Sequence, residues 1–168
     1  VSENDVYTDS DFWTENNLHI NLARTHDVFI LAPLSANTLS KCTYGISDNL
    51  LLNVFLSFTG PVLLAPAMHT EMFQNEVIQK NLKQLQKNGH FICGPVSGEL
   101  LSNDSGIGRM VDLDVIVKSV PIIMLKRLNL VNENLLISSG GTKECIDPVR
   151  IISNHSSGKL GETIAYMA

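Results

Sequence analysis

The sequence predicts an α/β domain built on a parallel sheet, and three observations support this prediction. Short apolar runs at Asp27–Ala32, Pro61–Leu64 and His90–Cys93 have the length and composition of buried strands. The stretches between them have helical patterns, and strands separated by helices pair in parallel through right-handed crossovers. The 168 residues, 44% hydrophobic and 17% charged, suit one globular domain with a sizeable core and a shorter remnant after it.

Two helices are expected after the first strand, Asp27–Ala32. The first, Asn37–Tyr44, is short and ends at Gly45. Asp48 is a good N-cap for the second, Asn49–Phe58. Leucine and phenylalanine occur nearly all round this second helix, so we expect its own sheet or another subunit to cover both sides.

A third helix is expected between the strands Pro61–Leu64 and His90–Cys93. Asn75 caps its start, it runs to Asn88, and Gly89 follows at the position where many helices end in the left-handed conformation. Its predicted apolar face comprises Val77, Ile78, Leu82 and Leu85.

The last part of the chain predicts a boundary and the start of a second domain. Asp112 opens a helix that runs to Pro121 or just past it. Leu125–Asn134 is polar and irregular enough to be a linker, and Leu135–Ser138 is expected to be a new strand. Because the chain begins with Val1 and a polar, irregular stretch, we expect both of its ends to be truncated.

Charge and cysteine usage exclude several classes of protein. The net charge is −5 and the lysines and arginines are scattered, so we expect no nucleic-acid partner. Cys42, Cys93 and Cys145 show no paired spacing, which favours a reducing cytoplasm over a disulfide framework. No run of 18 apolar residues indicates a membrane span, and no signal peptide is recognisable.

Three loops carry the chemistry that the sequence predicts. They are PAMHTEM (66–72), GELLSNDSGIGRM (98–110) and SSGGTKECIDPVRIISNHSSGK (138–159), and each follows an apolar run. Ligands of parallel α/β sheets bind at the carboxyl ends of strands, where these loops are expected. Gly106-Ile107-Gly108 lacks the third glycine of a dinucleotide fingerprint, and Ser157-Gly158-Lys159 lacks the first glycine and the final Ser or Thr of a P-loop. His19 and His26 are better explained as residues of a helix surface than as metal ligands, so no metal is expected in this part of the chain.

The order of these motifs resembles a known family. Residues 19–41, 47–55, 66–72 and 98–110 resemble the flavin-dependent phosphopantothenoylcysteine decarboxylases, and residues 135–161 resemble the opening of phosphopantothenate–cysteine ligase. This order is that of the bifunctional proteins of coenzyme A biosynthesis. The resemblance implies a flavodoxin-like or Rossmann-like parallel sheet with helices on both faces, followed by the first βα piece of a second α/β domain. It also implies a decarboxylase domain at 1–127 that lacks the family's first strand and loop, and an incomplete ligase domain at 128–168.

The resemblance implies an FMN site and a catalytic histidine. The FMN-binding residues would be Ser35, Ala36, Asn37, Thr38, Ala67 and Met68. A phosphate suits the first four because hydroxyls and helix N–H groups meet there, although a plain helix-capping turn is the alternative. His19 matches the family's active-site histidine, whose imidazole moves a proton near neutral pH, and a solvated surface histidine is the alternative.

The expected substrate residues include two departures from the family. His69 stands where the family has asparagine to hold the substrate carboxylate, and Ser102 stands where its proton-donating cysteine aligns. Because a serine hydroxyl is a much weaker acid than a thiol, Ser102 puts the last protonation in question. Cys93 is more simply a core residue than a substitute donor. Met72 and Arg109 match further substrate-binding positions, and Met72 is equally explained as a residue that fills space in the core.

The tail implies a nucleotide site of the ligase type. Its expected residues are Gly140, Gly141, Arg150, Asn154 and Lys159, and the complete ligase half would use CTP and Mg²⁺. The fragment itself is expected to have no ligase activity. The implied whole is a cytoplasmic homo-oligomer, a trimer or a dodecamer, that decarboxylates 4′-phosphopantothenoylcysteine to 4′-phosphopantetheine. The alternatives are an FMN-binding protein without catalysis, in a regulatory or assembly role, and a decarboxylase of peptide C-terminal cysteines.

Overall fold

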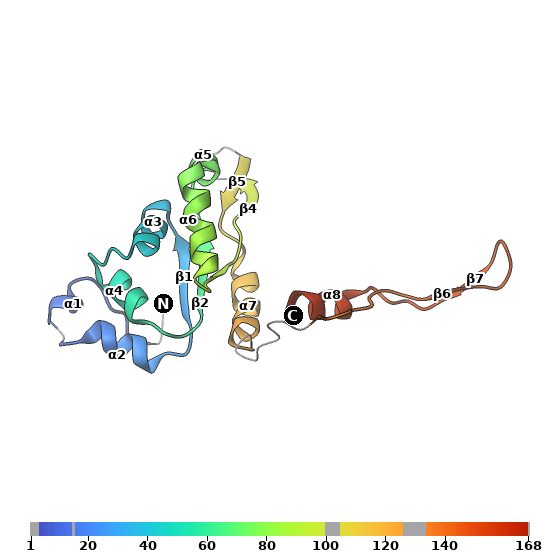
Figure 1. Ribbon diagram of the computed structural model, residues 1–168, viewed down its shortest axis with the longest axis horizontal. Coiled ribbons are helices and arrows are strands. Elements are labelled where there is room, and N and C mark those ends of the chain that lie inside the picture. The colour runs from blue at the N-terminus through green and yellow to red at the C-terminus, as the bar shows by residue number, and fades with distance from the viewer. Residues whose placement is uncertain (1–3, 15, 100–104, 126–133, 168) are drawn as a thin grey trace. The chain divides into compact units, whose positions relative to one another are not determined.

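A parallel sheet of three strands in the order β1-β2-β3 forms the centre of the first of two units into which the chain divides, Val1–Met124 and Leu125–Ala168 (Figure 1). The computed structural model describes residues 4–14, 16–99, 105–125 and 134–167. The strands are β1 (Phe29–Leu34), β2 (Val62–Pro66) and β3 (Phe91–Ile92). All neighbouring strands of this sheet pair in parallel, which confirms the predicted α/β class.

Strand β1 begins and ends two residues later than the sequence predicted. Its pairing starts where the Phe29 amide donates to the carbonyl of Pro61 (3.1 Å), and it continues past Pro33 to Leu34. A proline lacks the N–H that a central strand needs, but β1 is an edge strand of this sheet and tolerates it.

Side chains of β2 fill a core on each face of the sheet. All five residues of this strand are buried, and neighbours along a strand point to opposite faces. Val62 and Leu64 pack with the helices α3 (Ala36–Tyr44), α4 (Leu50–Ser57) and α6 (Glu76–Lys87). Leu63 and Ala65 pack on the other face with α7 (Leu113–Leu125). Burying each of these leucines contributes about 2 kcal/mol relative to exposure to water.

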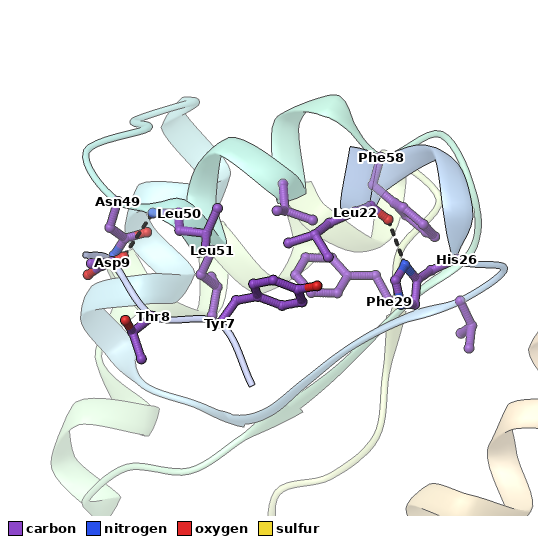
Figure 2. Close-up of a pocket in the computed structure, with 12 residues that line it drawn as sticks. Tyr7, Thr8, Asp9, Leu22, His26, Phe29, Asn49, Leu50, Leu51 and Phe58 are labelled. Carbon is purple, nitrogen blue, oxygen red and sulfur yellow. Dashed lines mark hydrogen bonds between the residues drawn. The ribbon is translucent and has the colours of Figure 1, made fainter. Parts of the chain in front are cut away.

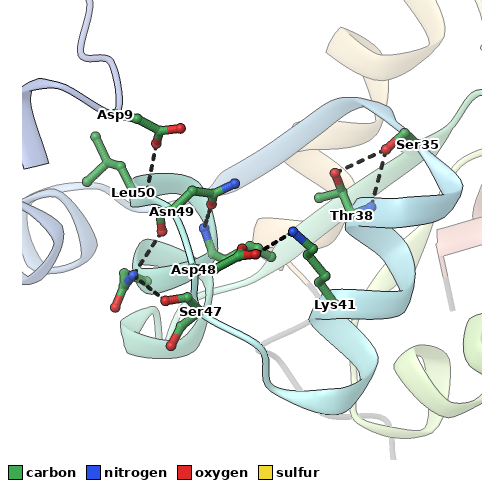
Figure 3. A network of polar contacts seen from close by, with 10 residues as sticks. Asp9, Ser35, Thr38, Lys41, Ser47, Asp48, Asn49 and Leu50 are labelled. Carbon is green, nitrogen blue, oxygen red and sulfur yellow. Dashed lines mark hydrogen bonds and ion pairs between the residues drawn. The ribbon is translucent and has the colours of Figure 1, made fainter.

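The capping residues explain where α3 and α4 begin and end. Ser35 caps α3, and Gly45 ends it in the left-handed conformation (φ 68°), as predicted. The predicted cap of α4 was wrong by one residue, because Asn49 rather than Asp48 accepts the hydrogen bond from the Leu52 amide (2.9 Å). Asp48 instead pairs with Lys41 of α3 at 2.5 Å (Figure 3).

Helix α6 agrees with its prediction except at one position. The Asn75 side chain accepts a hydrogen bond from the Val77 amide (2.9 Å), and Gly89 follows the helix with φ 91°. Ile78, Leu82 and Leu85 are buried as expected. The assignment of Val77 to the buried face was wrong, since this side chain is 55% exposed. Val77 and Ile78 are consecutive, so their side chains leave the helix about 100° apart.

Two short helices precede the sheet, and a hairpin lies beyond it. Helices α1 (Asp11–Thr14) and α2 (Leu18–Thr25) come first, and α2 packs on α4. The segment α5 (Thr70–Gln74) follows β2. The strands β4 (Val96–Glu99) and β5 (Ser105–Arg109) form an antiparallel hairpin that the sequence analysis did not predict.

The second unit contains a two-stranded hairpin and one helix. They are β6 (Lys143–Cys145), β7 (Ile151–Ser153) and α8 (Lys159–Met167). The predicted strand Leu135–Ser138 was wrong, because the described ladder of this unit pairs β6 with β7 only. Leu136 is fully exposed and has no partner strand against which a pleated surface would bury it. Most of the predicted linker, 126–133, lies outside the described residues.

The described helices include none with the length and apolar character needed to cross a membrane.

Candidate functional site

The turn between β1 and α3 presents hydroxyl groups at the start of a helix. Ser35 Oγ accepts a hydrogen bond from the Thr38 amide (3.2 Å) and lies 3.1 Å from Thr38 Oγ1 (Figure 3). Ser35 and Asn37 are exposed, whereas Ala36 is buried. The first N–H groups of a helix and its positive dipole end favour an anion. The turn therefore suits a phosphate group, such as the one in flavin mononucleotide (FMN).

The segment after β2 lies beside this turn. The Ala67 amide donates to the carbonyl of Leu34 (3.0 Å), the last residue of β1. This bond extends the β1–β2 pairing past the strand ends and holds Ala67 and Met68 near Ser35. Met68 is half-buried and packs against the core beneath. The structure thus brings together the six residues that the resemblance assigned to the flavin.

Strand β5 lies against the same segment. The Met68 amide donates to the carbonyl of Gly108 (3.0 Å), and α5 packs on β5. Arg109 follows directly and is exposed, and its guanidinium pairs with Asp112 at 2.8 Å. Met72 lies on α5 and is 50% exposed. Two predicted substrate residues, Met72 of α5 and Arg109 of β5, therefore belong to elements that contact each other.

His69 has a neighbour that the sequence analysis missed. Its Nδ1 atom contacts the carboxylate of Glu71, two residues further on in the first turn of α5. The signal was in the sequence, because an acidic residue is favoured in the first turn of a helix and is then close to the residue before it. This pair of side chains directly follows the Ala67–Met68 segment in the chain.

His19 lies elsewhere in the first unit. It is in the first turn of α2, where its ring stands edge-on to Phe12 of α1 with centroids 5.4 Å apart. Figure 1 shows α2 beside the first residues of β1 and away from α3 and α5. A single copy of the chain therefore does not place His19 with the loops at the carboxyl ends of β1 and β2.

Of the two candidate proton donors, Ser102 and Cys93, the structure describes only Cys93. Ser102 belongs to the connection between β4 and β5 and lies outside the described residues. Cys93 is buried, its amide donates to Leu64 of β2 (2.9 Å), and its sulfur lies 3.9 Å from Ser119 Oγ of α7. These contacts agree with its interpretation as a core residue.

A cavity of about 520 Å³ lies near the start of β1 and not at the carboxyl ends of the strands, where the candidate flavin turn lies (Figure 2). The Asp9 carboxylate closes part of its rim by accepting a hydrogen bond from the Leu50 amide (2.9 Å). His26 lies at the other side, with Nδ1 2.8 Å from the carbonyl of Leu22. Its lining residues are Tyr7, Thr8, Asp9, Leu22, His26, Val28, Phe29, Asn49, Leu50, Leu51, Val54 and Phe58.

Several titratable groups of the first unit have shifted pKa values and lie outside the loops at the carboxyl ends of β1 and β2. Burial raises the pKa of the Cys42 thiol to about 11. Burial also lowers the pKa of His90, whose ring packs on Phe55 with centroids 5.0 Å apart. The hydrogen bond from Lys41 lowers the pKa of Asp48. Among the described residues, no three side chains of the metal-ligating types gather into a candidate metal site.

The second unit brings some of its predicted nucleotide residues together. Gly141 lies against Asn154, and the Ser139 hydroxyl donates to the carbonyl of Gly158 (2.7 Å), next to Lys159 at the start of α8. Gly140 is in the left-handed region, with φ 101°.

Arg150 is placed differently. It lies in the turn between β6 and β7, where its Nε donates to Asp147 (2.5 Å), and this turn is at the far end of the hairpin from α8 (Figure 1).

A parallel α/β sheet with a polar, helix-starting turn at the carboxyl end of one strand defines a protein of the nucleotide-binding or flavin-binding class. Comparison with known families narrows this class. Residues 1–124 match the family described as Flavoprotein, and residues 130–168 match the DNA/pantothenate metabolism flavoprotein C-terminal domain. The chain belongs to the flavoprotein family.

Individual relatives agree with this assignment. The chain is 41% identical over 147 residues to the coenzyme A biosynthesis bifunctional protein CoaBC of Haemophilus influenzae, covering 88% of this chain and 37% of that protein. It is 42% identical over 153 residues to a cysteine/cysteine sulfinic acid decarboxylase of an unknown prokaryotic organism, covering 89% of this chain and 43% of the relative. The chain thus spans less than half the length of these relatives.

A solved structure is similar to the fold as well as to the sequence. A PPC decarboxylase mutant complexed with pantothenoylaminoethenethiol matches with a TM-score of 0.67 and 39% identity, over 69% of this chain and 68% of that one. This likeness confirms the flavodoxin-like arrangement predicted for the first part of the chain.

Proposed function

We propose that this protein binds FMN and catalyses the decarboxylation of 4′-phosphopantothenoylcysteine to 4′-phosphopantetheine in coenzyme A biosynthesis. The observation that carries the proposal is the contact among three segments at the carboxyl ends of β1 and β2. The Ala67–Leu34 and Met68–Gly108 hydrogen bonds hold the candidate flavin turn, the 66–72 segment and β5 side by side. Family membership and the similarity to a PPC decarboxylase support the same conclusion.

The residues have separate tasks in this proposal. The hydroxyls of Ser35 and Thr38 and the start of α3 hold the FMN phosphate, and Ala67 and Met68 lie along the flavin. When bound, FMN would supply reversible two-electron redox chemistry, which is needed both to oxidise the cysteinyl thiol and to return the same two electrons after the loss of carbon dioxide. His69 holds the substrate carboxylate until it leaves as carbon dioxide, and its contact with Glu71 favours the cationic imidazole for this task.

Proton transfers complete the reaction. His19 accepts the proton of the cysteinyl thiol, and Ser102 returns a proton to the carbon that carried the carboxylate. Met72 and Arg109 contact the remaining part of the substrate. The Arg109 guanidinium suits a phosphate. To bind one, it would exchange its ion pair with Asp112 for a pair with the phosphate.

The position of His19 favours a site shared between copies of the chain. His19 lies with α1 and α2, while the flavin turn lies at the opposite end of β1. We propose a homo-oligomer, a trimer or a dodecamer, in which one copy contributes His19 and its neighbour contributes the loops. The exposed leucines of α4, Leu51 and Leu56, are apolar surface that such an assembly would cover.

The remaining assignments concern the whole protein. We propose that residues 1–127 form the decarboxylase domain and that 128–168 begin a ligase domain. There Gly140, Gly141, Asn154 and Lys159 would hold CTP with Mg²⁺, and Arg150 would contribute from its turn. A cytoplasmic location fits the three free thiols, of which Cys42 and Cys93 are buried and Cys145 is exposed.

The experiment measures carbon dioxide and 4′-phosphopantetheine released from 4′-phosphopantothenoylcysteine with FMN present. The wild-type protein is expected to form both products in equal amounts. The His19→Asn variant is expected to lose about a hundredfold or more in kcat/KM, because it removes a proton acceptor.

Ser102→Cys serves as the second variant. Carbon dioxide release without phosphopantetheine, corrected by this substitution, would show that Ser102 is a defective donor. Bound FMN with no carbon dioxide release would contradict the proposed activity and favour a flavoprotein without catalysis.

A second candidate substrate class rests on one observation. The similarity to a cysteine/cysteine sulfinic acid decarboxylase is as high as that to CoaBC. Free cysteine and a peptide with a C-terminal cysteine should therefore be assayed beside 4′-phosphopantothenoylcysteine. A higher kcat/KM for either of them would reassign the substrate and leave the reaction class unchanged.

A further inference from the structure

Two glycines of β5 face the 66–72 segment where no side chain would fit. A Cβ atom built on Gly106 would overlap the hydroxyl of Thr70, and one built on Gly108 would overlap the carbonyl oxygen of Met68. Gly108 also has φ 153°, which side chains rarely adopt. Gly108 therefore lies directly against the backbone of the 66–72 segment and Gly106 against the Thr70 side chain, and the Met68–Gly108 hydrogen bond of 3.0 Å fixes the spacing.

The opposite strand of the hairpin provides a contrast. Gly98 pairs with Gly106 across the β4–β5 ladder. A Cβ on Gly98 would meet only the side chain of Arg109, whose Cδ lies 3.0 Å away and can move. The close approach is thus specific to the face that meets Thr70 and Met68, and it is not a general property of the hairpin.

We propose that Thr70, Gly106 and Gly108 are positioning residues that hold the β4–β5 hairpin against the 66–72 segment and thereby set the geometry of substrate binding. The inference rests on the function proposed above, because it concerns the same site. Thr70 is the first residue of α5, directly after His69, and Gly108 is directly before Arg109. A shift at this contact would therefore move two proposed substrate residues relative to each other.

The test compares two single alanine variants and one double variant. Gly106→Ala is expected to raise KM for 4′-phosphopantothenoylcysteine about tenfold, because small displacements of positioned groups are costly. FMN should still bind, since the Ser35–Thr38 turn that holds its phosphate is not part of the contact. Ser97→Ala, at an exposed position of β4, is the control and should leave KM within about twofold. The double variant Gly106→Ala/Thr70→Ala removes the overlapping hydroxyl but keeps the Thr70 Cβ 3.2 Å from the new methyl group, so KM should return only part of the way to the wild-type value.

A second measurement keeps the two proposals separate. Hydrogen exchange of the Met68 amide reports the contact in the FMN-loaded protein without any turnover. Its protection should fall in Gly106→Ala, remain in Ser97→Ala and return at least in part in the double variant.

The outcomes divide as follows. The inference is overturned if Gly106→Ala keeps the wild-type KM, if Ser97→Ala raises KM equally, or if the double variant folds but recovers neither KM nor protection. A wild-type protein that releases no carbon dioxide would contradict the proposed function. In that case, a loss of Met68 protection in Gly106→Ala would show that the contact has a structural role only, and this would overturn the positioning role.

Discussion

His90 shows how the burial of a single side chain makes stability depend on pH. Its ring packs on Phe55, and burial lowers the pKa of the folded state below the ordinary value of about 6.5. Because the folded state disfavours the proton, the stabilising contribution is present above about pH 6.5. It is lost as the pH falls through the lower folded-state pKa.

Urea unfolding between pH 5 and 7.5 should show this loss. The free energy of unfolding is expected to decrease toward pH 5 in the wild type, and less steeply in His90→Gln, which removes the titrating group. Asn21→Gln, at an exposed position that carries no titrating group, is the control and should keep the wild-type slope. Equal slopes for the wild type and His90→Gln would contradict the role assigned to His90.

The three thiols should differ in reactivity for reasons of burial. Cys42 and Cys93 are buried and the pKa of Cys42 is raised to about 11, whereas Cys145 is exposed. An alkylating reagent at pH 8 should modify one thiol per folded chain, and none in Cys145→Ser. All three should react in urea. Labelling of folded Cys145→Ser, measured by mass spectrometry, would contradict the described burial.

At the residue scale, the sequence identified candidate side chains better than it identified their partners. Ser35, Met68 and Arg109 lie at the strand ends or on the hairpin beside them, as their loops indicated. The pairing of Asp48 with Lys41 and the contact of His69 with Glu71 were not predicted. Such contacts depend on which residue begins a helix, and a shift of one residue turns a capping side chain toward another partner.

The start of α4 illustrates stabilisation at the scale of an element. Asn49 accepts from Leu52, Asp9 accepts from Leu50, and Asn53 donates to the carbonyls of Ser47 and Asn49 (Figure 3). The bonds to Asn49 and Asp9 satisfy N–H groups at the helix start that have no partner within the helix, and Asn53 supplies donors to two carbonyls beside it. The segment before α1 is joined to α4 through Asp9.

Removing the cap should destabilise the first unit. Asn49→Ala is expected to lower the free energy of unfolding by about 1 kcal/mol. Asn21→Ala, at an exposed position within α2, is the control and should change it by less than about 0.5 kcal/mol. Thermal or urea denaturation measures both variants. Equal effects of the two substitutions would show that Asn49 does not act as a cap.

Elements with their own periodicity were predicted, and those defined by pairing were not. The α6 pattern and its Asn75 cap were sufficient to place that helix, and the apolar runs located β1, β2 and β3. The β4–β5 hairpin depends on register between two glycine-containing segments, which no local pattern specifies. Leu135–Ser138 has a strand-like composition, but composition does not provide a partner strand.

At the scale of the whole molecule, the separation of His19 from the flavin turn has a direct consequence. If neighbouring copies share a site, two inactive variants can complement each other. His19→Asn and the double variant Ser35→Ala/Thr38→Val should each be inactive alone, the latter at FMN concentrations too low to load its weakened turn.

Unfolding both variants together and refolding them in equal amounts should restore activity. About a quarter of the wild-type activity is expected, because one site in four then pairs an intact histidine with an intact loop. No recovery after verified mixing of the copies would place the site within one chain.

The central claim is that the turn following β1 binds FMN, and the most direct test is a fluorescence titration of FMN. The wild-type protein is expected to bind one FMN per chain. Ser35→Ala/Thr38→Val should bind about tenfold or more weakly, because it removes two hydroxyl contacts to the phosphate. Circular dichroism should confirm that the variant remains folded. Equal affinity in both proteins, or no binding by the wild type, would contradict the account.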